Sequence, residues 1–209
     1  MIQPKANAFI IFLIPSIFAF HYSFVSIVYG QVSEEIPFEQ EKPTIKVDIE
    51  GTTSNDKIKG GDGDDEINGR EGDDELYGGR GDDELDGDEG NDIIKGEHGN
   101  DELQGGEGDD KISGERGNDL LMGDEGNDKL NGGKGDDRVA GAEGDDEING
   151  GEGYDILVGG IGADIFICDE FDQIIDFNID GGDKIEGSCD MIDSLPSGLS
   201  NTSEIINSQ

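Results

Sequence analysis

The most regular feature of this chain is a hydrophobic side chain that recurs at every ninth residue from Ile58 to Phe166. Polar residues stand on both sides of most members of this column. An apolar residue between polar neighbours suits a short strand that turns one side chain inward and its neighbours outward. The pattern therefore predicts a series of short strands, each contributing one buried residue: Ile58, Ile67, Leu76, Leu85, Ile94, Leu103, Ile112, Leu121, Leu130, Val139, Ile148, Leu157 and Phe166.

Glycine and aspartate follow the same period, so that residues 51–167 divide into 13 blocks of nine without insertion or deletion. Position one is always Gly, position four is Gly except for Ser54 in the first block, and position six is always Asp. Glycine at positions one and four permits positive φ and lets backbone carbonyls approach one another without interference from a Cβ atom. If nine residues make half a coil, odd blocks stack into one sheet and even blocks into another. The predicted fold is all-β: a parallel β-roll solenoid of 13 nonapeptide repeats with a C-terminal cap.

The charge of the chain changes this picture, because a roll of this composition would not fold unaided. The 209 residues include 52 acidic and 14 basic side chains, giving a net charge of -38, and only 32% of residues are hydrophobic. Such chains bury too little apolar surface to offset their conformational entropy. The acidity also excludes nucleic acid and anionic membrane surfaces as partners, since both are bound through Lys and Arg. Cations must neutralise the chain if it folds.

The position-six aspartates are the candidate ligands for such cations. Stacked strands would align them in two files with a spacing of about 4.8 Å. At that distance two carboxylates repel each other by roughly 1 kcal/mol in water and more inside a protein. We therefore predict metal ligation by the whole column: Asp56, Asp65, Asp74, Asp83, Asp92, Asp101, Asp110, Asp119, Asp128, Asp137, Asp146, Asp155 and Asp164.

Calcium is the cation that these ligands suit best. Ca²⁺ takes six to eight oxygen ligands in a flexible shell, which aspartates and glycine-opened carbonyls could supply together. Mg²⁺ demands a stricter octahedron and keeps its waters. Zinc and copper prefer nitrogen and sulfur, which are scarce here. The sequence thus predicts Ca²⁺ as the cofactor and calcium binding coupled to folding.

The nonapeptides resemble those of the repeats-in-toxin (RTX) family, whose pattern is Gly-Gly-x-Gly-x-Asp-x-apolar-x. Residues 78–86, with the sequence GGRGDDELD, match it fully. The resemblance implies a calcium-bound parallel β-roll in which the aspartates of one block and of the block two later share an ion with intervening carbonyls. Thirteen blocks would then hold about eleven ions.

Several blocks depart from the family pattern. Position five lacks Asp or Asn at Tyr154 and Ala163, and Ser54 replaces the glycine of the first turn. Atypical blocks at both ends are expected where a solenoid is capped. Position two is glycine in only some blocks, and others carry Arg70, Asp88, Glu97, Glu115, Asp124 and Ala142 there.

The residues after the repeats are expected to close the roll. Phe166, Phe171 and Phe177 would cover the open strand edges at its end. Cys168 and Cys189 bracket this cap, and the sequence leaves open whether they form a disulfide or stay as two thiols. The expected organisation is a signal peptide (1–30), a short polar linker (31–50), the calcium-binding β-roll (51–167), the C-terminal cap (168–186) and a flexible tail (187–209).

The N-terminal segment decides the expected location. It carries Lys5, an apolar stretch over residues 8–29 and no acidic residue before Glu34, which is typical of a secretory signal peptide. The alternative is an uncleaved membrane anchor, because the apolar stretch approaches the roughly 20 residues of a spanning helix. Both interpretations put the repeats outside the cytoplasm, and secretion is the preferred one.

No catalytic motif such as HExxH or GxSxG occurs in the sequence, so an enzyme is not expected. The predicted function is calcium binding by a secreted β-roll that folds on binding calcium, as an extracellular structural or interaction module. Its protein or cell-surface partner is not specified by the sequence. The alternative is an ice- or surface-binding β-roll with calcium as scaffold. The charged residues at position three, such as Arg80, Glu89 and Lys134, disfavour it.

Overall fold

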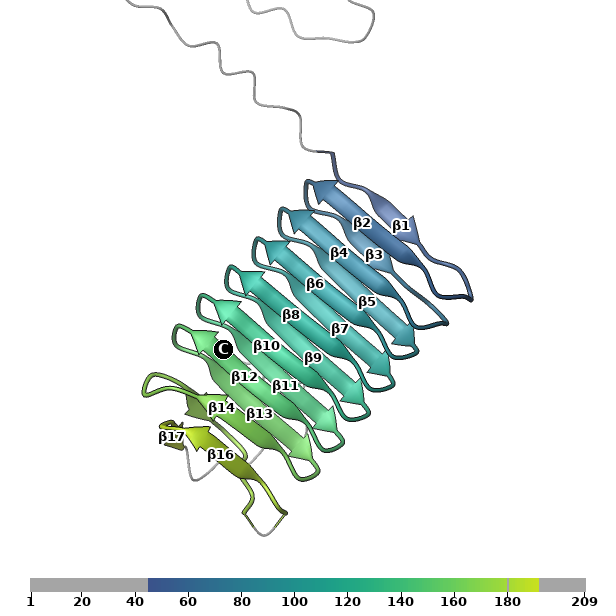
Figure 1. Ribbon diagram of the computed structural model, residues 1–209. Helices are drawn as coiled ribbons and strands as arrows, with labels where there is room; N and C mark the ends of the chain where they lie inside the picture. Colours follow the sequence, from purple (N-terminus) through teal and green to yellow (C-terminus); the bar gives the residue numbers. More distant parts are fainter. Residues whose placement is uncertain (1–44, 180, 192–209) are drawn as a thin grey trace, which may run out of the picture. The chain divides into compact units, whose positions relative to one another are not determined.

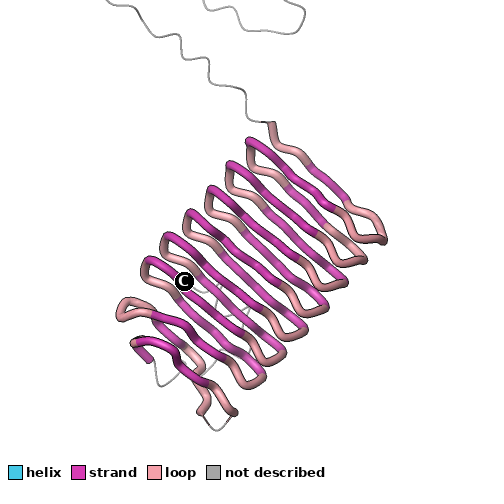
Figure 2. The backbone as a smooth tube through the Cα atoms, viewed as in Figure 1, coloured by secondary structure: helices cyan, strands magenta, loops and turns pink. Residues whose placement is uncertain are grey.

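The computed structural model describes residues 45–179 and 181–191, and every regular element among them is a β-strand (Figures 1 and 2). The strands alternate between two sheets, and every pairing between neighbours is parallel. Sheet A contains, in spatial order, β1 (Asp48–Glu50), β3 (Glu66–Asn68), β5 (Glu84–Glu89), β7 (Glu102–Glu107), β9 (Leu120–Glu125), β11 (Arg138–Glu143), β13 (Ile156–Ile161), β15 (Gln173–Ile174) and β17 (Asp190–Met191). Sheet B contains β2 (Lys57–Asp62), β4 (Glu75–Arg80), β6 (Ile93–His98), β8 (Lys111–Arg116), β10 (Lys129–Lys134), β12 (Glu147–Glu152), β14 (Ile165–Cys168) and β16 (Lys184–Gly187).

The register of the strands confirms the predicted parallel β-roll. Leu130 pairs with Ile112 on one side and with Ile148 on the other, so each residue pairs with its equivalents two blocks before and two blocks after it. Odd blocks therefore start the strands of sheet B and even blocks those of sheet A. One coil of the roll consists of two blocks, as the repeat length indicated.

The strands are longer than the last three positions of a block. β2 and β4 to β13 begin at position seven and run through position three of the following block, as in β8 and β10. Only positions four to six remain for the turn. The longer strands extend the parallel ladder of backbone hydrogen bonds, which supports a roll whose core is thin.

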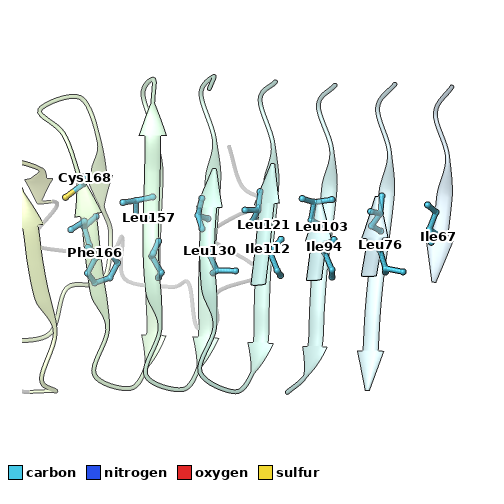
Figure 3. Packing of buried hydrophobic residues seen from close by; sticks show 14 residues of the cluster. Ile67, Leu76, Ile94, Leu103, Ile112, Leu121, Leu130, Leu157, Phe166 and Cys168 are labelled. Atoms are coloured by element: carbon cyan, nitrogen blue, oxygen red, sulfur yellow. The ribbon is translucent and has the colours of Figure 1, made fainter. Parts of the chain in front are cut away.

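The column of apolar residues at position eight forms the core between the two sheets, as predicted. Its members from Ile67 to Phe166 are at most 2% exposed, and they stack strand after strand along the roll (Figure 3). Ile58, in the first block, is only partly buried. Ile49 of β1 precedes Ile58 by one repeat length and packs on the same cluster. The core thus extends into residues that precede the first block.

Glycine plays different parts at the three positions where it recurs. Position-four glycines use the positive φ that glycine permits, whereas position-one glycines do not and, after the first block, make room for the nearby aspartate Oδ2. Positive φ occurs instead at position two. Six non-glycine residues at this position, all after the first block, adopt φ between 72° and 85°, a region that costs L-residues about 1–2 kcal/mol each: Arg70, Asp88, Glu97, Glu115, Asp124 and Ala142.

The roll continues past the last block with altered spacing. Leu157 pairs with Ile174, slightly less than two blocks later, and Phe166 pairs with Ile185, slightly more than two blocks later. The ring of Phe177 lies 6.2 Å from that of Phe166 and covers the core cluster. Phe171 does not contribute to this cover, because it is 46% exposed and packs edge-on against Tyr154 instead.

The two cysteines form a disulfide, with Cα atoms of Cys168 and Cys189 5.6 Å apart. This bond joins the end of β14 to the segment between β16 and β17. Of the two possibilities that the sequence left open, the structure shows the disulfide.

Several sequence expectations concern residues outside the described ranges. The signal peptide or anchor (1–30), residues 31–44 of the linker and residues 192–209 of the tail all lie there. Within residues 45–179 and 181–191, no helix is long and apolar enough to cross a membrane.

Candidate metal centres

The turns that join the strands are built around position-four glycines. Gly117 is typical, with φ of +132°, and a Cβ atom there would overlap the carbonyl oxygen of Gly99 in the preceding coil. Equivalent turns of successive coils therefore lie closer together than any L-residue would allow. Among the hydrogen bonds of the described turns, none uses the carbonyl oxygen of a position-four glycine. These oxygens remain available to another partner.

The position-six aspartates stack inside the turns in two files, as predicted. In each pair, one carboxylate oxygen, Oδ1, accepts a hydrogen bond from the backbone N–H of the aspartate two blocks earlier. Asp119 accepts in this way from Asp101 at 2.8 Å, and Asp128 accepts from Asp110 at 2.8 Å. The bonds accepted by Asp74 through Asp164 measure 2.7 to 3.0 Å. Each aspartate thus fixes its turn to the previous coil.

The other carboxylate oxygen, Oδ2, is buried and has no hydrogen-bond partner in every position-six aspartate after the first block. Buried polar atoms are rarely left without a partner, and a carboxylate oxygen is costly to leave so. These atoms lie against the position-one glycines, where a Cβ would collide with them. The residues concerned are Asp65, Asp74, Asp83, Asp92, Asp101, Asp110, Asp119, Asp128, Asp137, Asp146, Asp155 and Asp164.

The unpaired oxygens fit a hard cation bound by both side chain and backbone. Among the described residues, no three His, Cys, Asp or Glu side chains cluster as a metal site would need them. A cation in a turn would therefore need main-chain oxygens beside the aspartates. Carboxylates and backbone carbonyls are the donor set that calcium prefers, whereas zinc and copper would require nitrogen or sulfur.

Burial disfavours the charged form of these aspartates. It raises the pKa of four of them to about 7 and of six to about 6, while the hydrogen bond from the preceding coil acts in the opposite direction and neighbouring carboxylates add to the rise. The pKa is about 7 for Asp101, Asp128, Asp137 and Asp146, and about 6 for Asp83, Asp92, Asp110, Asp119, Asp155 and Asp164.

Asp56, in the first block, differs from all the other position-six aspartates. It is only half-buried, and its Oδ2 accepts hydrogen bonds from the backbone N–H and the hydroxyl of Thr52, at 2.7 and 2.8 Å. Ser54 stands in this turn in place of the usual glycine. The structure therefore does not give Asp56 the unpaired oxygen that its counterparts share.

Two aspartates beyond the repeats extend the files, which the nine-residue period did not reveal. Asp172 accepts from the N–H of Asp155 at 3.3 Å, and Asp183 accepts from that of Asp164 at 3.1 Å. Their second oxygens accept from the N–H groups of Asp169 and Asn178. Both carboxylates are thus satisfied within the chain. The sequence did contain a signal for them: Asp172 follows Asp155 by 17 residues and Asp183 follows Asp164 by 19, close to the 18 residues of two blocks.

A second ladder runs along the outside of the turns and was also missed from the sequence. The side-chain oxygen of each Asp or Asn at position five accepts from the backbone N–H two blocks later. Asn100 accepts from Asn118 at 2.9 Å. Tyr154 and Ala163 donate to this ladder but cannot accept, so they end it. Their departure from the repeat pattern marks the last full coils.

Comparison with known proteins agrees with this geometry. The family model of the RTX calcium-binding nonapeptide repeat, which describes four copies, matches residues 50–85, 86–121, 96–130, 113–148 and 140–167. These matches together span residues 50–167, more than half of the 209 residues. No curated protein matches the chain. Because the family model covers more than half of the sequence, the chain belongs to the RTX calcium-binding nonapeptide repeat family, and its repeats bind Ca²⁺.

Proposed function

We propose that this chain is an extracellular structural or interaction module whose β-roll folds when calcium binds. The observation that carries the proposal is the unbroken set of buried, partnerless Oδ2 atoms from Asp65 to Asp164. An anionic file of this length opposes folding, because each carboxylate is desolvated and faces its neighbours. Calcium supplies the positive charge that balances the files, so binding and folding become one event.

The residues that would hold the ions are the position-six aspartates, and all of them from Asp65 to Asp164 have an unpaired Oδ2. Each would act together with position-four carbonyl oxygens of its own file. Seven aspartates in the odd blocks and six in the even blocks leave six and five intervals, hence about eleven ions. Asp56 belongs to the first of these intervals and should form the weakest site, since its Oδ2 already accepts from Thr52.

Secretion is supported by two independent features. The N-terminal residues 1–30 have the composition of a signal peptide. The Cys168–Cys189 disulfide is of the kind that persists in oxidising compartments. Outside the cell calcium is also abundant enough to keep many weak sites filled, whereas inside the cell it is not.

We assign no catalytic role to the roll. His98, the only histidine in the described residues, is exposed at the end of β6. The row of position-three residues on sheet B includes Arg80, His98, Arg116 and Lys134, which lacks the regular small polar side chains of an ice-binding face. A structural or interaction role therefore remains the better assignment.

A calcium titration followed by far-UV circular dichroism tests this function. The chain lacking residues 1–30 should show a disordered spectrum in chelator and gain a β signal on addition of calcium. Chelation should reverse the gain, and magnesium at the same concentration should not produce it. A β signal that is equally strong in chelator and in calcium would contradict the coupling of folding to binding.

A further inference from the structure

The outer face of sheet A changes character along the roll. Its outward side chains come from positions seven and nine, since position eight faces the core. In β3, β5 and β7 these positions hold Glu66, Asn68, Glu84, Asp86, Glu102 and Gln104. In β9, β11 and β13 they hold Leu120, Met122, Arg138, Ala140, Ile156 and Val158. A charged surface gives way to an apolar one within a single sheet.

Two residues of the apolar part are completely buried although they point away from the core. Ala140 and Val158 are both 0% exposed, and they form a cluster with Leu120, Met122 and Ile175 that is separate from the main core. We call this cluster the outer strip. Position-nine residues in the first half of sheet A, such as Asn68 and Gln104, are partly or fully exposed.

The complete burial of Ala140 and Val158 within the outer strip points to a cover. In sheet B the equivalent position-nine residues, from Tyr77 to Asn149, all retain exposed surface. Their sheet has the same repeat and the same parallel pairing as sheet A, so stacking of neighbours along the sheet does not by itself bury an outer side chain. The side chains of alanine and valine are also too short to fold back and shield themselves from solvent. Leu120, Met122 and Ile175 pack against Ala140 and Val158 from the sides, and a segment lying over the two residues accounts for the absence of any exposed surface.

We propose that residues 192–209 dock on the outer strip of sheet A. The strand β17 is the last strand of sheet A and ends at Met191, so the following residues start at the edge of this sheet (Figure 1). From β17 to β9 there are four strand spacings, about 19 Å. Residues 192–209 could span about 60 Å in an extended conformation. This segment is therefore long enough to cross the strip and return.

The composition of the segment matches the surface it would cover. It contains two acidic residues and no Lys or Arg, while the strip is flanked by Arg138. Its apolar residues are spread along its length rather than gathered at one point: Ile192, Leu195, Leu199, Ile205 and Ile206. This docking would replace the flexible tail expected from the sequence with a segment that shields an apolar face of the roll.

Covalent footprinting in saturating calcium tests the docking. A carbene label should modify Met122 and Val158 only weakly in the chain that lacks residues 1–30. Truncation after Met191 should increase the labelling of both residues severalfold. Labelling of Tyr77 on sheet B should not change, and it serves as the internal control. The β signal in circular dichroism shows that the truncated roll is folded.

A second pair of variants keeps the full length and so guards against misfolding of the truncated chain. The double variant Leu195→Asp/Leu199→Asp should expose the strip as truncation does. Its matched control, Ser197→Asp/Ser200→Asp, adds the same charge at polar positions and should leave the labelling of Met122 and Val158 low.

Three outcomes would overturn the docking. Labelling that stays low in both the truncated chain and Leu195→Asp/Leu199→Asp would show that another element covers the strip. Strong labelling that falls as protein concentration rises, together with a dimer in sedimentation, would assign the strip to a second copy. Strong labelling of the chain lacking residues 1–30 that disappears when those residues are restored would assign the cover to the N-terminal segment.

Discussion

Asp109 and Asp110 are neighbours in one turn, yet their carboxylates differ in every respect that matters for function. Asp109 is exposed, and its oxygen accepts from the backbone and side-chain N–H groups of Asn127, which lower its pKa. Asp110 is 1% exposed, and burial raises its pKa to about 6. Each accepts a backbone hydrogen bond, so burial decides the outcome. The exposed position-five carboxylates of the outer ladder can stay charged. The buried position-six carboxylates of the inner files must be neutralised by a cation or a proton.

The largest test of this difference is the pH dependence of folding without calcium. Ten inner aspartates have folded-state pKa values of about 6 or 7, above the 3.8 of a free Asp. A raised pKa stabilises the fold when the group is protonated, fully below pH 3.8, and this stabilisation is lost as pH rises through 6 to 7.

In chelator, the β signal should therefore grow as pH falls from 8 toward 4, and it should disappear on return to pH 8. Calcium binding should show the opposite trend, because protons compete for the same oxygens below pH 7. Circular dichroism in chelator across this range checks the first trend, and calcium titrations at pH 6 and 8 check the second. A chain in chelator whose β signal rises with pH would contradict the burial of the inner files.

A matched pair of substitutions gives the next largest effect. Asp110→Asn removes one inner charge in the middle of the roll and should raise the calcium midpoint about tenfold, equal to about 1.4 kcal/mol. Asp109→Asn changes the outer neighbour and should leave the midpoint unchanged, because Asn already accepts the same hydrogen bond at Asn91, Asn100 and Asn118. Equal shifts for the two variants would remove the distinction between the ladders.

The smallest effect should come from the strained backbone at position two, within the strands. Asp88 has φ of 72° at position two, and Asp88→Gly should stabilise the calcium-bound roll by about 1 kcal/mol by removing this strain. Glu89→Gly, one residue later and outside the positive-φ region, should instead destabilise it by about 0.5–1 kcal/mol. Denaturant unfolding in saturating calcium measures both. Destabilisation by Asp88→Gly would show that its side chain contributes more than the strain costs.

The sequence predicted those parts of the structure in which one repeat position always holds the same kind of residue and that residue has one structural role. Position eight is always apolar and position six is always Asp, so the core and the inner files followed from the period. The hydrogen-bond ladder at position five was not predicted because both Asp and Asn occur there, and their shared property is an acceptor oxygen rather than a charge. Asp172 and Asp183 were missed because their spacing from Asp155 and Asp164 leaves the period, in opposite directions.

The outer strip could not be predicted for a different reason. Leu120 and Met122, Ala140 and Val158 belong to three strands that lie two blocks apart in the sequence, and each stands next to a core residue as an ordinary strand neighbour would. They meet only because strands that are two blocks apart in the sequence are adjacent in sheet A. Sequence shows the composition of each strand, whereas a patch on a sheet depends on which strands are neighbours.

The pairing of residues two blocks apart also limits how a molecule of this kind can change its length. Loss or gain of two adjacent blocks in the middle of the roll would leave every later strand in its own sheet, with the same neighbours and the same ends. Loss of a single block would move every later strand into the opposite sheet, so that Met122 and Val158 would leave sheet A for sheet B. Genes for such rolls should therefore lengthen and shorten by pairs of repeats rather than by single ones.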